Sequence, residues 1–272
     1  FFSLSSVKSM IFFKKIKKIL PESKFIITYQ FSIPGRNFFI WSSWPHIKKN
    51  IKTFLKSKLL KILKFYLPNA DYIFLPSKDC YSDFSHFSGK DTKFQCIESK
   101  DATLLMHSRL KSSLIDKEYF LYLDSSIVDC IDYKLMNIDV RIEKELYYNS
   151  LEKFLKFISR IYEKEIIIAA HPSSSFFKNS SGTFRSIRYF KNRTADLAAH
   201  ADAFISDFPT NSITYPVILN KPLILFKSEK LLRTYQRCNW HYRYFIGLEY
   251  FLNKEFINID QNSRSQLLSK IK

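Results

Sequence analysis

Three short polar clusters are the best candidates for chemistry in this sequence, because each lies at the end of a short apolar run. They are Asp124-Ser125-Ser126, His171-Pro172-Ser173-Ser174, and Ser206-Asp207 followed by Thr210-Asn211-Ser212. Of the six histidines, only His171 directly follows a run predicted as a buried strand, and Pro172 fixes the turn that presents its ring. An imidazole there can donate a hydrogen bond to a phosphate or protonate a leaving group near neutral pH. Hydroxyls at a helix start also suit a phosphate, because unpaired N–H groups and the helix dipole favour an anion.

Short apolar runs and helical stretches alternate from about residue 118 onward, which is typical of a βαβ domain with a parallel sheet. Strands are predicted at 118–124, 165–170, 184–190, 203–206, 223–226 and 256–259. Helices are predicted at 143–162, 194–198, 211–219, 229–237 and 263–271, with Thr194 and either Asn211 or Ser212 as N-caps. Ligands of open parallel sheets bind at the carboxyl ends of the strands, so we expect the three polar clusters to meet at that edge.

Residues 1–110 are predicted to form the later part of another α/β domain, with strands at 25–29 and 72–75. The boundary is placed between residues 100 and 117. The predicted fold class is therefore α/β, with a partial N-terminal α/β domain at 1–110 and a Rossmann-like domain at 118–272. The chain begins at Phe1 rather than at a methionine, and we interpret it as a fragment or a processed chain.

The chain is strongly basic, with a formal net charge of +18, and its lysines concentrate near the start. In residues 47–65, apolar side chains recur at three- and four-residue steps and lysines fill the other face, which predicts a basic amphipathic helix. A solvated lysine face over a core contact and docking on anionic lipid both fit this pattern. Nucleic acid is the least favoured partner, because no nucleic-acid-binding motif accompanies the charge.

Composition excludes several classes of protein. A hydrophobic fraction of 46% and only four glycines exclude disorder across the whole chain and collagen-like repeats, and no apolar run approaches the ~20 residues that span a bilayer. The four cysteines form no CxxC pair, which predicts free thiols in a reduced, cytoplasmic setting. The sequence has no Asp-x-Asp triplet and no close His/Asp cluster, so neither a metal nor another cofactor is expected.

A resemblance to a known family is carried by the runs IIIAAHPSS and NRTADLAAHADAFISDFPTNSITYPVILNKPLILF. They resemble the C-terminal half of bacterial surface-polysaccharide glycosyltransferases of the GT-B type, namely capsule polysialyltransferases, Kdo transferases and CDP-glycerol glycerophosphotransferases. Those proteins share a strand that ends in His-Pro, a segment T-x-x-L-x-x-x-A-D-x-x-I-(S/T)-D, a Ser/Thr-rich helix start and a Lys-Pro pair. The match covers about residues 118–228. The matching residues are His171, Pro172, Thr194, Leu197, Ala201, Asp202, Ile205, Ser206, Asp207, Thr210 to Ser212, Lys221 and Pro222.

The resemblance implies that His171 and the region of Ser212 bind the nucleotide and phosphates of a donor such as CMP-sialic acid, CMP-Kdo or CDP-glycerol. It also implies a cleft between two Rossmann-like domains and no essential metal. The predicted donor-binding residues are Pro172, Ser173, Ser174, Ser206, Asp207, Thr210, Asn211 and Ser212. The sequence departs from the family twice: Thr210-Asn211-Ser212 replaces the usual Ser-Ser or Ser-Thr pair, and no acidic-acidic-glycine triplet supplies the general base.

Two catalytic residues are predicted, His171 for the departing phosphate and Asp124 as a candidate carboxylate for the acceptor hydroxyl, because Asp124 ends the first strand of its domain. Arg185, Arg188 and Arg193 are candidates for steering an anionic substrate. Asp and Ser at a strand end also cap turns, and surface arginines are often merely solvated.

The expected function is transfer of a sugar from a cytidine nucleotide to a growing surface glycan, with a nucleotide-sugar donor and a glycan or lipid-linked acceptor as partners. Three alternatives stay open: a CDP-glycerol-type glycerophosphotransferase, a UDP-sugar epimerase, and a non-catalytic scaffold that docks on a membrane through residues 47–65. The epimerase is disfavoured because four glycines supply too few glycine-rich loops. The expected location is the cytoplasm, with peripheral contact at the inner face of the plasma membrane.

Overall fold

The computed structural model describes residues 7–22, 24–28, 69–75, 78, 81, 88–98, 100–129, 144–174, 184, 186–207, 210–231, 249 and 256–260. The chain divides into two compact units, Phe1–Lys100 and Asp101–Lys272. Each unit has a parallel sheet of its own.

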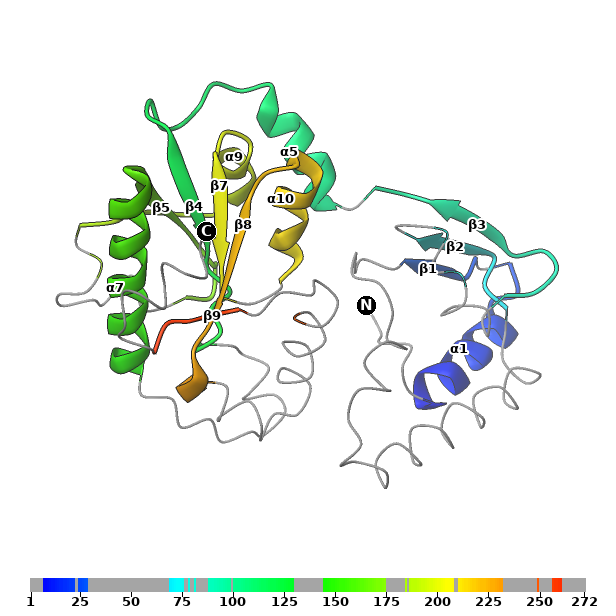
Figure 1. Cartoon of the computed structure of the whole chain (residues 1–272). Helices are drawn as coiled ribbons and strands as arrows, with labels where there is room; N and C mark the ends of the chain where they lie inside the picture. Colours follow the sequence, from blue (N-terminus) through cyan, green and yellow to red (C-terminus); the bar gives the residue numbers. More distant parts are fainter. Residues whose placement is uncertain are drawn as a thin grey trace. The chain divides into compact units, whose positions relative to one another are not determined.

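The first unit is built on a parallel sheet with the strand order β1-β2-β3 (Figure 1). The described elements are α1 Val7–Ile19, β1 Ile26–Thr28, β2 Tyr72–Leu75 and β3 Lys93–Cys96. The strands predicted at 25–29 and 72–75 are confirmed, while α1 and β3 were not predicted. The basic helix predicted at 47–65 lies outside the described residues.

Asp71 connects α1 to this sheet. One of its carboxylate oxygens accepts the backbone N–H of Phe25 at 2.6 Å and the ammonium of Lys17 at 3.4 Å. The hydrogen bond from Phe25, together with the charge of Lys17, lowers the pKa of Asp71 below its usual value. A short polar side chain therefore anchors the helix to the start of two strands.

The second unit is an α/β domain whose described strands are all parallel, in the order β6-β5-β4-β7-β8-β9. The strands are β4 Tyr119–Leu123, β5 Glu165–Ala170, β6 Arg188–Lys191, β7 Ala203–Ser206, β8 Leu223–Lys227 and β9 Ile257–Asn258. The central strands β4 and β7 are buried on both faces, as parallel strands between helical layers must be. The α/β class with parallel sheets is thus confirmed, and this strand order is compatible with a Rossmann-like fold.

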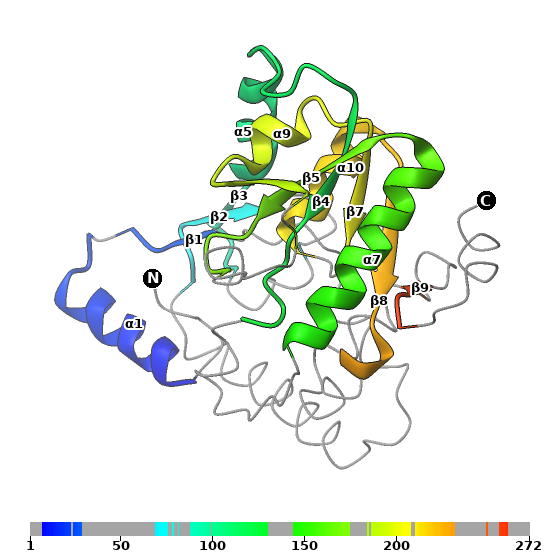
Figure 2. The ribbon, with the colours of Figure 1, turned by 90° about the vertical axis from the view of Figure 1, so that its left-hand side faces the viewer.

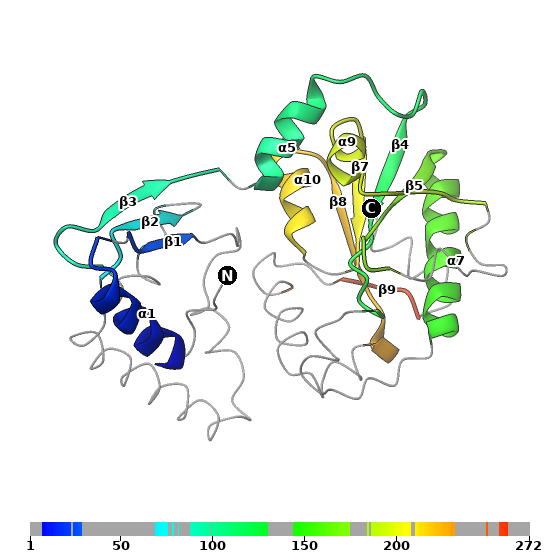
Figure 3. The ribbon, with the colours of Figure 1, turned by 180° about the vertical axis from the view of Figure 1, so that it is seen from behind.

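Helices cover both faces of this sheet. Figures 1 and 3 show α7 on one face and α5, α9 and α10 on the other, and Figure 2 looks onto the α7 side. The helices are α5 Lys100–Arg109, α7 Lys144–Tyr162, α9 Thr194–Ala198 and α10 Thr214–Leu219. Because strand side chains alternate, Phe120 and Tyr122 pack in the α7 core, while Tyr119, Leu121 and Leu123 pack in the core under α5, α9 and α10.

Most of the elements predicted in this unit are confirmed, and the differences lie at their ends. The strand predicted at 184–190 begins only at Arg188, and α5 was not predicted. Thr194 is the first residue of α9 rather than its N-cap, and neither Asn211 nor Ser212 caps α10, because a 3-10 turn at Asn211–Ile213 precedes that helix. The predicted helix at 229–237 is described only to residue 231, and the one at 263–271 lies outside the described residues.

No helix within the described ranges is both long enough and apolar enough to cross a membrane.

Candidate functional site

The candidate site lies at the carboxyl edge of the larger sheet. Asp124, His171 and Asp207 directly follow β4, β5 and β7, which are neighbours in the sheet. The strand order reverses at β4, because the chain passes from β4 through β5 to β6 on one side and resumes with β7 on the other. In open α/β sheets, ligands bind outside the carboxyl ends of the strands at such a reversal. The structure therefore brings together one residue from each polar cluster.

Asp124 joins the loops that follow β4 and β5. One carboxylate oxygen accepts the backbone N–H of Ser126 at 2.8 Å, and the other accepts the backbone N–H of His171 at 2.9 Å. Only 8% of Asp124 is exposed. Burial raises the pKa of Asp124, while the N–H groups of His171 and Ser126 oppose that rise. Both oxygens are therefore occupied in holding the backbone of the site.

His171 presents an exposed ring on the turn that begins at the end of β5. Its Nδ1 accepts the backbone N–H of Ser173 at 3.2 Å and lies 2.7 Å from the Ser173 hydroxyl, which in turn lies 3.2 Å from the Ser126 hydroxyl. With Nδ1 as acceptor, the neutral ring carries its proton on Nε2. The turn itself is closed by a hydrogen bond from Ser174 N–H to the His171 carbonyl at 3.0 Å. His171 can thus offer an N–H donor to a ligand, while Pro172 forms the turn.

Asp207 is a buried carboxyl at this edge. One carboxylate oxygen accepts the hydroxyls of both Tyr147, at 2.7 Å, and Tyr122, at 3.1 Å. The pKa of Asp207 is raised to about 6, chiefly by burial; the Tyr147 hydroxyl opposes this rise, and the negative charge of Asp124 adds to it. The same burial raises the pKa of each tyrosine well above its usual value, so both remain hydrogen-bond donors.

Three polar atoms at this edge have no hydrogen-bond partner among the described residues: the second carboxylate oxygen of Asp207 and the hydroxyls of Ser125 and Ser174. Both hydroxyls lie near enough to a carboxylate to lower a pKa, Ser125 that of Asp207 and Ser174 that of Asp124, but neither has the geometry of a hydrogen bond. Buried polar atoms are normally paired. These three therefore leave unused capacity to bind a polar ligand.

The remaining predicted donor-binding residues do not share this arrangement. Ser206 is the last residue of β7 and is buried. The Thr210 hydroxyl accepts the backbone N–H of Ser212 at 3.3 Å, which stabilises the 3-10 turn. For Asn211 only the backbone is described. These residues precede α10, a helix of only six residues.

Several residues of the site were missed from the sequence. Tyr122 and Tyr147, which donate to Asp207, carry no local signal of their own, since each occupies an ordinary position in a strand or an amphipathic helix. Among the arginines predicted to steer anions, Arg188 makes a bidentate ion pair with Glu165 and Arg193 pairs with Asp196. Arg185 lies outside the described residues.

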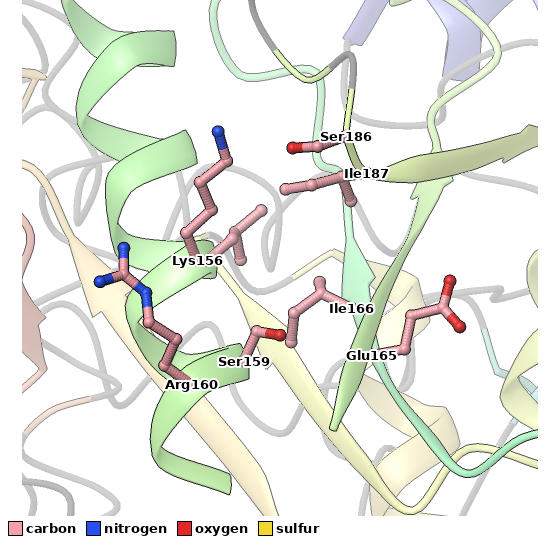
Figure 4. A pocket seen from close by; sticks show the side chains of 8 residues that line it. Lys156, Ser159, Arg160, Glu165, Ile166, Ser186 and Ile187 are labelled. Atoms are coloured by element: carbon pink, nitrogen blue, oxygen red, sulfur yellow. The ribbon is translucent and has the colours of Figure 1, made fainter. Parts of the chain in front are cut away.

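A separate pocket lies at the amino end of β5, between the end of α7 and the start of that strand (Figure 4). It is lined by Leu155, Lys156, Ser159, Arg160, Glu165, Ile166, Ser186 and Ile187. Lys156 pairs with Glu152, and Glu165 pairs with Arg188, so these charges serve the protein's own ion pairs. Over the described part of the chain, no group of three His, Cys, Asp or Glu residues is placed to hold a metal ion.

Comparison with models of known protein families gives no match for this chain, and comparison with functionally curated proteins gives no significant match.

Proposed function

We propose that this chain is a glycosyltransferase of surface-polysaccharide synthesis, of the GT-B type, that binds a cytidine-activated sugar at the carboxyl edge of the larger sheet. One observation carries the proposal: an exposed histidine, two buried carboxyls and unpaired hydroxyls converge where the strand order reverses. That position is the usual nucleotide-binding place in doubly wound folds. The motif resemblance around His171 and Asp207 supports a nucleotide-linked donor over other ligands of this fold.

In the proposed reaction, the bond between the anomeric carbon of the sugar and the phosphate oxygen of the donor breaks, and its electron pair stays with the phosphate. The acceptor hydroxyl forms the new bond to that carbon and loses its proton to a carboxylate. His171 Nε2–H donates to the departing phosphate, and preorganised donors of this kind contribute ~3 to 4 kcal/mol each. Asp124 acts as a positioning residue, because both of its oxygens hold backbone N–H groups.

The proposed partners are the nucleotide-sugar donor, a glycan or lipid-linked acceptor, and an anionic membrane surface that gives a peripheral location at the inner face of the plasma membrane. A glycerophosphotransferase would use the same edge of the sheet with CDP-glycerol as its donor. Assays with both types of donor separate these two reactions, and absence of turnover with either indicates a scaffold.

The first test is thermal unfolding of the full chain with CMP, CDP, UMP, UDP or GDP. A ligand that binds only the folded state adds about 2.7 kcal/mol at 100 times its Kd, so stabilisation by the cytidine nucleotides alone is expected. His171→Ala should abolish this stabilisation. His107→Ala is the matched control, because His107 is an exposed histidine on α5. No stabilisation of the wild-type protein by any nucleotide would contradict the proposal.

A further inference from the structure

Lys191 is a cation beside the candidate site that the proposed function has not used. It is the last residue of β6, and in the sheet it is paired with Ala170, the residue before His171. Its ammonium donates a hydrogen bond to the carbonyl of Ser174 at 2.5 Å. Lys191 therefore lies against the 171–174 turn, at the same edge of the sheet as the exposed His171 ring.

The surroundings of Lys191 differ from those of the other half-buried lysines of this unit. Lys156 pairs with Glu152 at 2.8 Å, Lys227 pairs with Glu249 at 2.6 Å, and Lys164 pairs with Glu118 and Asp202. Lys191 has no carboxylate within ion-pair distance in the described residues. A half-buried ammonium with only one carbonyl acceptor retains N–H donors for a ligand.

The sequence around this lysine excludes a local acidic partner. Residues 166–195 contain five Lys or Arg and no Asp or Glu. Two of the five, Arg188 and Arg193, are already paired with acids outside this stretch, Glu165 and Asp196. Lys178 and Arg185 lie outside the described residues, so Lys191 is the one of these five cations that the structure describes without an ion pair.

A second and independent feature of the same turn also indicates a ligand. The Ser174 hydroxyl is in a residue only 1% exposed and has no hydrogen-bond partner in the described part of the chain. The carboxylate oxygens of Asp124 accept the backbone N–H groups of Ser126 and His171, so no hydrogen bond in the described residues joins them to the Lys191 ammonium. A cation, an imidazole N–H and an unpaired hydroxyl therefore belong to one short turn and its neighbouring strand.

We infer that Lys191, His171 and Ser174 form a phosphate-binding subsite at the carboxyl ends of β5 and β6. This inference deepens the proposed function and rests on it for the identity of the ligand, a donor phosphate. It places the phosphate at the 171–174 turn rather than at the 210–212 turn before α10. The ammonium neutralises the phosphate charge that grows as the donor bond breaks, while the Nε2–H of His171 donates to a phosphate oxygen.

The test is isothermal titration calorimetry of the full chain with CMP, pyrophosphate and cytidine, the last of which has no phosphate. Lys191→Gln removes the charge and keeps an N–H donor for the Ser174 carbonyl, and Lys191→Arg keeps the charge. Lys156→Gln is the matched control, since it removes a half-buried lysine from the pocket of Figure 4, which lies at the amino end of β5. Circular dichroism and thermal unfolding without ligand establish that each variant is folded.

Lys191→Gln should weaken the binding of CMP and pyrophosphate at least about tenfold, as expected for loss of a charged hydrogen bond. Lys191→Arg should stay within a few-fold of wild type, and cytidine should distinguish none of the variants. Added salt should weaken pyrophosphate binding in the wild-type protein more than in Lys191→Gln.

The outcomes separate this inference from the proposed function. Equal CMP affinity of wild type and Lys191→Gln, with loss in His171→Ala, would overturn the role of Lys191 and leave the proposed function standing. Pyrophosphate binding that depends on Lys191, without binding of any nucleotide, would keep the phosphate subsite and overturn the proposed function. Loss of binding in Lys156→Gln but not in Lys191→Gln would place the phosphate in the pocket at the amino end of β5 and refute the inference. If wild type binds none of the probes, both are wrong.

Discussion

The substitution Asp207→Asn tests the buried acid at the centre of the site. In the wild-type protein, this carboxyl is only 3% exposed, accepts the Tyr147 and Tyr122 hydroxyls on one oxygen, and has no partner on the other in the described residues. Asparagine keeps the shape of the side chain and a carbonyl oxygen that both tyrosines can reach. The substitution therefore removes the titrating charge with little change in packing.

The sign of the effect follows from the pKa of Asp207, which is 3.8 in an ordinary environment and about 6 in the folded protein, chiefly because of burial. Between these two values the folded state binds more protons than the unfolded state, so this group makes the folded protein less stable as the pH rises. Over pH 4 to 7.5 the loss amounts to about 2 to 3 kcal/mol. Above pH 7 the wild-type protein carries the full penalty, and Asp207→Asn carries none.

The assay is urea unfolding of the two proteins at half-unit steps from pH 4 to 7.5. The free energy of unfolding of Asp207→Asn minus that of wild type should rise by about 2 to 3 kcal/mol across this range. Removal of the charge also lowers the pKa of the neighbouring Asp124, because the two carboxyls repel, and this acts in the same direction. A difference that stays flat with pH would refute the assignment of a buried, proton-holding Asp207.

Two further substitutions test the lowered pKa of Asp196 and the hydrogen bond from Tyr147 to Asp207. Asp196→Asn should destabilise the protein by about 1 to 2 kcal/mol at pH 7, because hydrogen bonds from Lys111, Ser108 and Arg193 lower the pKa of Asp196 to about 2. The stabilisation by the ionised Asp196 is fully present above pH 3.8 and is lost as the pH falls towards 2. Urea unfolding of both proteins at pH 7 and pH 2 measures this difference. Tyr147→Phe removes the hydroxyl that donates a 2.7 Å hydrogen bond to Asp207. It should destabilise the protein by about 1.5 to 3 kcal/mol at pH 8 and by less at pH 5, where Asp207 is protonated. Equal losses of stability at the two pH values would contradict a hydrogen bond from Tyr147 to a charged Asp207.

The carboxyl edge of the sheet could be located from the sequence because the strands that end there are continuous apolar runs. The 165–170 run matches β5 at both ends, and the 203–206 run matches β7. A strand buried on both faces is apolar at nearly every position, so polar residues mark its end: His171 directly after β5, and Ser206-Asp207 at the end of β7. His171 and Asp207 were found in this way, and their place at one edge followed from parallel pairing.

Helix starts were predicted less well than strands. Thr194, Asn211 and Ser212 have the side chains of N-caps, yet none of them caps a helix in the structure. The preference of a residue type for a cap is worth about 1 kcal/mol, and local packing overrides it. Here a 3-10 turn stabilised by Thr210 takes the place that the helix start was predicted to occupy.

The sequence by itself determined the class of fold, the positions of the central strands and the polar residues that end them, since these depend on local apolar pattern. Only the tertiary structure decided what those residues do. Tyr122 and Tyr147 reach Asp207 across separations of 85 and 60 residues, and Lys191 meets the 171–174 turn only because β6 pairs with β5. Strand order and helix docking set such contacts through long-range packing. A local sequence pattern does not indicate which side chain a distant strand or helix will bring into contact with a given residue.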